Sequence, residues 1–175
     1  EVRLPDPATA HRLGIAIIYQ ELNYVPTLTV AENVLLGRLP RRGPIVAWEA
    51  VYREAGAILA PLAPHLDVRL PVAALPVAER QVVEIARALS LDARVIVMDE
   101  PTAALSQQEV ARLFALVRRL AAGGVSVVYI SHRLDEVFSL ADRVAVLRDG
   151  ALVGAWPVGE TNRAAVVRAM VGRSV

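Results

Sequence analysis

The sequence predicts an α/β protein with a parallel sheet, and three observations support this class. Short runs rich in β-branched residues lie at 14–20, 94–98, 125–131 and 143–150. Amphipathic stretches with helical spacing separate most of these runs. Strands that alternate with helices at this pitch favour a parallel sheet whose faces are covered. The chain has 175 residues, of which 55% are hydrophobic, so it can bury one good core.

The first half of the chain is predicted to be mainly helical. The run 14–20 begins with a glycine, is rich in β-branched residues and is expected to form a buried strand. Thr29 is expected to cap a short helix that stops at Gly37, and 38–44 is a turn-rich break. Two longer helices are expected at 48–60, where prolines end it, and at 77–90, where apolar residues share one face.

The second half is predicted to alternate strands with helices. The expected order is a strand at 94–98, a helix at 107–121, a strand at 125–131, a helix at 134–140 and a strand at 143–150. After a turn at Asp149-Gly150, residues 151–158 are expected to add an edge strand. A helix capped at Thr161 then closes the chain.

Composition excludes several classes of function. A formal net charge of +1 argues against electrostatic capture of nucleic acid. The absence of cysteine removes disulfides, thiolate metal sites and thiol catalysis, and it suits a reducing compartment. No apolar run approaches the roughly 20 residues of a membrane span, and the first residues do not resemble a signal peptide. We therefore expect a cytoplasmic protein that neither crosses a membrane nor binds nucleic acid.

Two adjacent carboxylates, Asp99 and Glu100, come directly after the strand at 94–98. In open α/β sheets, ligands bind outside the carboxyl ends of the strands, which is where these residues should lie. A carboxylate pair is tolerable there if a cation or a reacting water binds to it, and Mg²⁺ with nucleotide phosphates is the commonest such case. The alternative is that both acids stabilise the N-terminus of the next helix.

Two other predicted strands also end on polar side chains, Gln20 and His132. A histidine at this edge could hold a phosphate oxygen and an attacking water, although a lone histidine is more often an ordinary surface residue. The carboxyl ends of parallel strands meet at one edge of the sheet. The four polar residues at these ends therefore favour a functional site over chance.

Longer motifs resemble the ATP-hydrolysing cassette of ABC transporters. The segment "VIVMDEPTAALS" resembles that family's Walker B strand and D-loop, and "YQELN" resembles its Q-loop. The segment "YISHRLDEVFSLADRVAVLRDG" resembles its H-loop strand and the helix and strand after it. The match covers nearly the whole chain in the expected order. The segments "YQELNYVPTLTVAENVLLGR", "VEIARALS" and "WPVGETNRAAVVRAMVGR" are similar to the first cassette of tandem bacterial monosaccharide importers of the ribose, galactose and xylose type.

The resemblance implies a P-loop NTPase-like parallel sheet with an inserted α-helical subdomain, and ATP with Mg²⁺ as cofactors. The resemblance implies three parts. Residues 1–25 would be the end of the N-terminal core with the Q-loop. Residues 26–90 would form the helical subdomain, and residues 91–175 the catalytic core. The implied partners are a transmembrane permease that docks around 20–36, a second cassette and, indirectly, a periplasmic sugar-binding protein. The chain would then lie on the cytoplasmic face of the inner membrane.

The resemblance also implies roles for single residues. Asp99 would order Mg²⁺ through water, and Glu100 would be the general base for the water that attacks the γ-phosphate. His132 would fix that water and the γ-phosphate, while Gln20 would complete the metal shell and sense the membrane subunit. The D-loop would comprise Ala104, Leu105 and Ser106, with Ser106 in place of the family's aspartate and still able to cap the next helix.

The signature segment departs from the family. Residues 75–79 read "LPVAE" where the family has Leu-Ser-Gly-Gly-Gln. Pro76 offers neither a hydroxyl nor an N–H, and Val77 and Ala78 add side chains where glycines let amides approach an anion. Glu79 adds a negative charge. Either this helix has drifted because nothing binds to it, or the two composite sites of a cassette dimer are asymmetric, one fast and the other slow.

The Walker A loop is not found in these 175 residues, which contain no lysine. We therefore expect the sequence to begin inside a cassette whose phosphate-binding loop lies before Glu1, and we expect no ATP hydrolysis from this fragment alone. Three functions are open. They are the energising cassette of a sugar importer, a soluble ABC-superfamily ATPase without a transport role, and a non-catalytic remnant.

Overall fold

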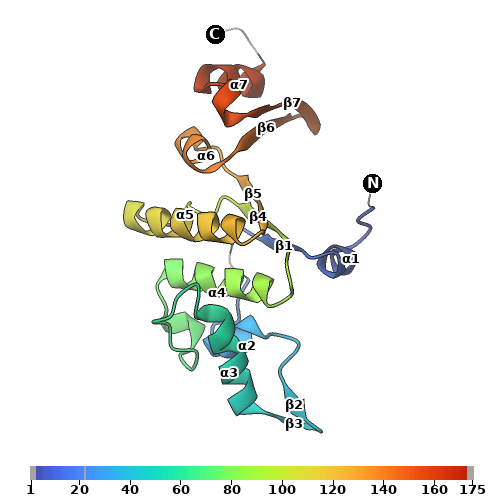
Figure 1. The fold of residues 1–175 in the computed structure, drawn as a ribbon, viewed down its shortest axis with the longest axis vertical. Coiled ribbons are helices and arrows are strands. Elements are labelled where there is room, and N and C mark those ends of the chain that lie inside the picture. The colour runs from blue at the N-terminus through green and yellow to red at the C-terminus, as the bar shows by residue number, and fades with distance from the viewer. Residues whose placement is uncertain (1–2, 22, 173–175) are drawn as a thin grey trace. The chain divides into compact units, whose positions relative to one another are not determined.

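The computed structural model describes residues 3–21 and 23–172. These residues form two compact units, within 1–130 and within 131–175 (Figure 1). In the described ranges, no helix is both long and apolar enough to cross a bilayer.

A three-stranded parallel sheet forms the centre of the first unit. Its order is β1-β4-β5, with β1 at Ile15–Ile18, β4 at Val95–Asp99 and β5 at Ser126–Ile130. Ile18 pairs with Met98, and Asp99 pairs with Ile130. The predicted α/β class with a parallel sheet is therefore confirmed, and so are the first three strands.

The alternation of side chains explains how this sheet is packed. Ala16, Ile18, Ile96 and Met98 are all buried and alternate along β1 and β4, as expected for one face of a pleated sheet. Helix α4, Val77–Leu89, contacts β1, and helix α5, Gln107–Ala122, contacts β5. This packing fixes the strands whose carboxyl ends carry the candidate site.

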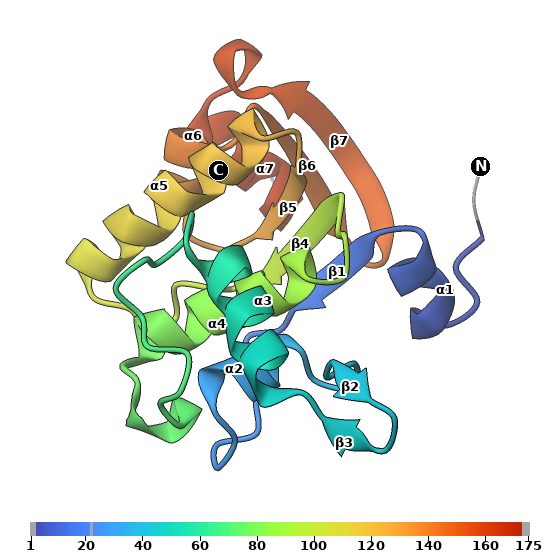
Figure 2. The ribbon, with the colours of Figure 1, turned by 60° about the horizontal axis from the view of Figure 1, so that its bottom comes forward.

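The helical part of the first unit has its own core. It contains α2 at Val30–Val34, α3 at Trp48–Leu59 and α4, which lie together in Figure 2. The hydrophobic cluster of this part includes the fully buried Val51 and Val83. Thr29 caps α2 as predicted, in a reciprocal capping box with Glu32.

Some elements of the first unit were not expected. Helix α1 spans Pro7–Arg12, and a 3₁₀ turn, η1, spans Val72–Ala74. The predicted break at 38–44 contains β2, Arg41–Arg42, which pairs in antiparallel fashion with β3, Ile45–Val46. The turn-forming residues of the break therefore close a very short hairpin, whose pairing was not predicted.

The second unit comprises α6 at Leu134–Leu140, β6 at Arg143–Arg148, β7 at Ala151–Pro157, a 3₁₀ turn, η2, at Val158–Glu160, and α7 at Arg163–Val171. Its core contains Val137, Val144, Val146 and Val166.

Two predictions for the second unit were wrong in detail. Strand β6 was expected in the parallel sheet, but it pairs in antiparallel fashion with β7 in a separate two-stranded sheet. The reason is the tight turn at Asp149 and Gly150, which both have positive φ and so send the chain straight back. The cap of α7 is Asn162 and not Thr161, because the Asn162 side chain accepts the N–H of Ala165 at 3.0 Å.

Candidate nucleotide-binding site

The carboxyl edge of the parallel sheet brings three predicted site residues to one side of the first unit. Asp99 is the last residue of β4, and Glu100 is the next residue. Gln20 lies two residues beyond the end of β1 and is exposed. Since Ile18 pairs with Met98, Gln20 and Glu100 leave their strands at the same level of the register. This is the edge at which open α/β sheets bind ligands.

Glu100 has an unusual backbone for a non-glycine residue. Its φ is 46°, in the left-handed region, and its N–H donates to the carbonyl oxygen of Ile130 at 3.0 Å. Its own carbonyl accepts the N–H of Ala103 at 3.2 Å, which starts a turn. Such a conformation costs on the order of 1 kcal/mol or more and is concentrated at functional sites. The strand therefore ends abruptly at the residue proposed as the general base.

The helix after the acidic pair is capped by a different residue. Ser106 accepts the N–H of Glu109 at 3.4 Å, and the Ser106 N–H donates to the Glu109 carboxylate at 2.8 Å. These hydrogen bonds from the Ser106 backbone and hydroxyl lower the pKa of Glu109. The prediction that Ser106 caps this helix is confirmed. The alternative in which Asp99 and Glu100 stabilise its N-terminus is not supported, because helix α5 begins at Gln107.

The other two residues of the predicted D-loop lie in the turn between Glu100 and this cap. Ala104 is exposed and Leu105 is half-buried. The Leu105 N–H donates to the carbonyl oxygen of the buried Thr102 at 3.1 Å. This bond closes the turn just before Ser106, so the D-loop is a compact connection and not an extended arm.

The degenerate signature lies at the N-terminus of α4. Pro76 is the N-cap residue and makes no side-chain cap bond, and the helix begins at Val77. The half-buried Ala78 is next to Val77 in the first turn. The Glu79 N–H donates to the Pro76 carbonyl at 3.1 Å, and its Oε1 lies 3.3 Å from Nε2 of His65. The structure therefore places these residues at a helix N-terminus with the Glu79 carboxylate next to an imidazole.

Arg80, in the signature helix, was not singled out from the sequence, and it connects this helix to the residue that follows the Q-loop segment. The Arg80 guanidinium donates to the carbonyl of Leu75 at 2.7 Å, to that of Ala73 at 2.9 Å and to the hydroxyl of Tyr24 at 2.9 Å. Two turns further on, Arg87 donates to the Asn23 carbonyl at 2.9 Å. Basic residues seven apart on one helix are the only sequence signal of this connection.

The same helix also carries a buried carboxylate. Glu84 is 7% exposed, and its Oε1 lies 4.0 Å from the Arg87 guanidinium. Burial raises the pKa of Glu84, and the nearby Arg87 opposes this shift. Glu84 was not singled out from the sequence, because a glutamate in an amphipathic helix normally indicates a solvated face.

His132 belongs to the second unit and is exposed. It lies between Ser131 and Arg133, two residues along the chain from the end of β5 at Ile130. Both neighbours contact the buried carboxylate of Glu136. The structure thus brings together Gln20, Asp99 and Glu100 in one unit, and it gives His132 a defined local environment in the other.

The oxygen atoms at the sheet edge fit Mg²⁺ chemically. Magnesium prefers oxygen ligands and usually binds through one or two carboxylates together with substrate phosphates and water. Asp99 supplies a carboxylate and Gln20 an amide oxygen, next to Glu100. Within the part of the chain that the structure describes, no group of three or more His, Asp or Glu side chains could hold a metal. Together with phosphate oxygens, the side chains of Asp99 and Gln20 would suit a cation that arrives with a nucleotide.

The fold is that of an ATP-binding cassette. Over 96% of this chain and 72% of the other, the structure is similar to the ADP conformation of an ATP-binding cassette of an ABC transporter, with 27% identity and a TM-score of 0.77. A nucleotide-free cassette gives a TM-score of 0.72 at 29% identity, over 87% of this chain and 64% of that one. The family model described as ABC transporter matches residues 3–103, and the chain belongs to this family.

Several curated relatives are sugar import proteins. The chain is 55% identical over 174 residues to ribose import ATP-binding protein RbsA 1 of Rubrobacter xylanophilus, covering 99% of this chain and 35% of that protein. It is 45% identical over 175 residues to putative ribose/galactose/methyl galactoside import ATP-binding protein 3 of Agrobacterium fabrum, covering 100% of this chain and 35% of the relative. The chain therefore spans about a third of the length of the curated relatives it matches.

Proposed function

We propose that this chain is part of the ATP-binding and ATP-hydrolysing subunit that energises import of a monosaccharide across the bacterial inner membrane. The observation that carries this proposal is the acidic pair Asp99 and Glu100 at the carboxyl edge of the parallel sheet, with Glu100 in a left-handed backbone conformation. Identities of 45% and 55% to the two sugar import proteins, over nearly the whole chain, support the substrate class.

The proposed chemistry is hydrolysis of the γ-phosphate bond of ATP by water. When bound, Mg²⁺ with ATP supplies the reacting phosphate and neutralises the charge that develops on it. Asp99 and Gln20 would hold the metal, Glu100 would take a proton from the attacking water, and His132 would orient that water. Phosphoryl transfer depends mainly on positioning and charge neutralisation, so fixed side chains at a sheet edge suit it.

The proposed partners are those that a transport role requires. A transmembrane permease would dock on the surface around 20–36, a second cassette would complete the composite ATP sites, and a periplasmic sugar-binding protein would act indirectly. The chain would work on the cytoplasmic face of the inner membrane, without nucleic acid. The names of the relatives favour this role over a soluble ABC-superfamily ATPase or a non-catalytic remnant.

Uptake of labelled sugar tests this proposal. The complete subunit and its permease are reconstituted in liposomes, and ATP-dependent uptake of ribose, galactose and xylose is measured with the sugar-binding protein present. We expect uptake of at least one of these sugars, and none when the subunit is omitted. If no monosaccharide is taken up while ATP is hydrolysed, the transport role is wrong and the soluble ATPase is favoured.

A further inference from the structure

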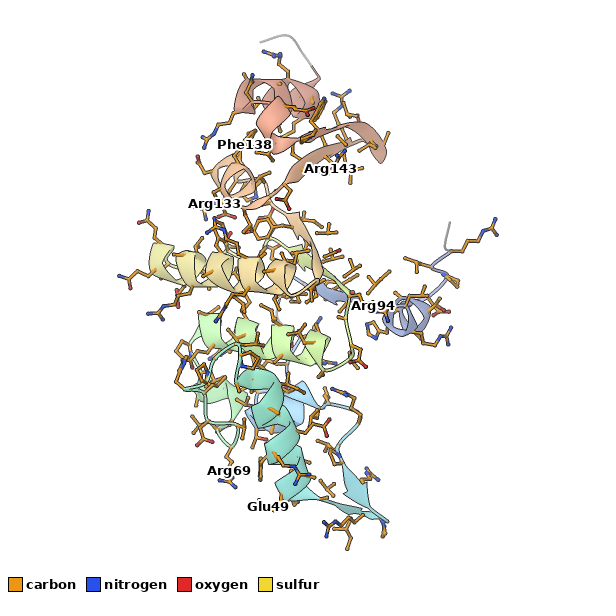
Figure 3. The ribbon with its side chains drawn as sticks, viewed as in Figure 1. Glu49, Arg69, Arg94, Arg133, Phe138 and Arg143 are labelled. Atoms are coloured by element: carbon orange, nitrogen blue, oxygen red, sulfur yellow. The ribbon has the colours of Figure 1, made fainter. Side chains whose placement is uncertain are left out.

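Both chain neighbours of His132 contact the same buried carboxylate. Glu136, in the first turn of α6, is only 4% exposed. Its Oε1 lies 2.6 Å from the guanidinium of Arg133, the residue labelled at the start of this helix in Figure 3. Its Oε2 accepts the hydroxyl of Ser131 at 3.2 Å. The two oxygens of the carboxylate therefore engage residues on opposite sides of His132.

Backbone hydrogen bonds close this arrangement. The Arg133 N–H donates to the Ser131 hydroxyl at 3.0 Å, and the Glu136 N–H donates to the Arg133 carbonyl at 3.0 Å. The segment 131–133 is thus held at both ends by the Glu136 side chain and by helix α6, which carries Glu136. With both flanks fixed, the backbone of His132 has little freedom to move.

The contacts of Glu136 differ from those of an ordinary helix cap. A buried carboxylate is costly unless it is paired, and removing its partners or its charge leaves an uncompensated group. A cap needs only a side chain at the helix end, yet the N-cap residue Arg133 makes no side-chain cap bond. Glu136 instead holds a short charge-assisted contact to the guanidinium and a second contact to a hydroxyl.

We propose that Glu136 is a positioning residue for His132, which it acts on through Ser131 and Arg133. This inference rests on the proposed function only for what His132 does. Neutralising Glu136 weakens both tethers and lets His132 move away from the position in which it orients the attacking water. The expected effect is therefore on the local structure at His132 first and on turnover second.

The structural part is tested on the 175-residue chain by NMR with ¹³C-labelled histidine. The chain has three histidines, so His11 and His65 serve as internal references. In Glu136→Gln we expect the imidazole signal of His132 to shift or broaden while the other two stay in place, and the Arg133 amide to exchange about tenfold faster. A His132 signal that superimposes on wild type would overturn the proposal.

Two further variants keep this test decisive. Asp135→Asn is the matched control, since it removes a carboxylate from the same helix that is 79% exposed and pairs with Arg163. We expect it to leave the His132 signal unchanged. Ser131→Ala removes one tether but keeps the ion pair between Glu136 and Arg133. If Glu136→Gln does not fold, an unmoved His132 signal in Ser131→Ala overturns the proposal.

The kinetic part uses the transporter assembled from the complete subunit and its permease. Glu136→Gln is expected to lower kcat with KM for ATP unchanged, and to cause no further loss when added to His132→Ala. A purely structural role would instead lower the activity of both backgrounds by the same factor, and this result would overturn the proposal. If His132→Ala turns over like wild type, the proposed role of His132 fails, whereas the NMR result still decides the role of Glu136.

Discussion

Gln81 Nε2 donates to the carbonyl oxygen of Pro101 at 2.5 Å, and both residues are buried. This bond joins the degenerate signature helix α4 to the turn just after Glu100. Among the described residues it is a direct polar link between the helix that would face a partner cassette and the acidic pair that would carry out the chemistry. The bond therefore fixes α4 against the backbone beside Glu100.

Replacing Gln81 should destabilise the first unit. In Gln81→Leu the buried Pro101 carbonyl loses its donor, which typically costs about 1–3 kcal/mol. Urea denaturation of the 175-residue chain measures this loss, with Gln108→Leu as the control because Gln108 is exposed. Equal midpoints for Gln81→Leu and the control would show that the bond contributes nothing.

The backbone of Glu100 allows a test of local strain. Its φ of 46° suits glycine better than any residue with a side chain. Glu100→Gly should therefore be more stable than Glu100→Ala by about 1 kcal/mol, although both lose the carboxylate. The same pair of substitutions at Glu54, within helix α3, should show the opposite order, because glycine is unfavourable in a helix interior. The same order at both positions would refute the strain at Glu100.

The cap of α5 has a pH signature. Ser106→Ala should cost about 1 kcal/mol, and Ser106→Asp, which restores the family's residue, should cost little because aspartate is an equally good cap. The pKa of Glu109 is lowered in the folded state by hydrogen bonds from Ser106. Its stabilising contribution is therefore present above the unfolded-state pKa and is lost as the pH falls through the folded-state pKa.

Thermal unfolding from neutral to acidic pH checks this prediction. The difference between wild type and Ser106→Ala should be largest near neutral pH and should shrink on acidification. A difference that is constant across this range would mean that the Ser106 hydroxyl does not stabilise the Glu109 carboxylate, because Ser106→Ala keeps the backbone bond to this group.

The degenerate signature should limit the rate of ATP hydrolysis at the composite site to which it contributes. Pro76 makes no side-chain cap bond, and Glu79 brings a carboxylate to the helix N-terminus. Restoring Ser at 76, Gly at 77 and 78 and Gln at 79 in the complete subunit should speed the slow site about tenfold or more. This gain assumes one or two regained charge-assisted hydrogen bonds of about 1.5–3 kcal/mol each.

Single-turnover hydrolysis with Glu100 replaced by Gln isolates that slow site. The variant Glu79→Gln alone serves as a control, because it removes the charge without restoring any donor from the missing serine and glycines. Unchanged rates in the fully restored variant would show that the signature does not limit hydrolysis at this site. The hypothesis of two asymmetric composite sites would then be rejected.

Local signals predicted most of the elements. The helix beginning at Val77 and the strand ending at Asp99 were predictable from periodicity, and the Thr29 and Ser106 caps from residue type. The pairing of β6 could not be fixed in this way, since periodicity identifies a strand but not its partner. Only the turn residues Asp149-Gly150 indicate that it folds back on β7.

The chemistry of the candidate site was predictable from the sequence, but the residues that hold its parts in place were not. Asp99, Glu100 and His132 stand out because charged or titratable residues come directly after apolar strands. Glu136 and Gln81 do not stand out, because polar residues in amphipathic helices normally indicate a solvated face. Their burial and their contacts depend on tertiary packing, which brings distant segments together and which no local pattern records.

The central claim is that Glu100 is the general base for ATP hydrolysis. Steady-state turnover by the assembled transporter tests it most directly, with Glu100→Gln compared against Glu160→Gln, an exposed glutamate of the second unit. We expect Glu100→Gln to bind ATP normally but to lose about 10²- to 10⁴-fold in turnover, while the control turns over like wild type. Wild-type turnover in Glu100→Gln would contradict the account.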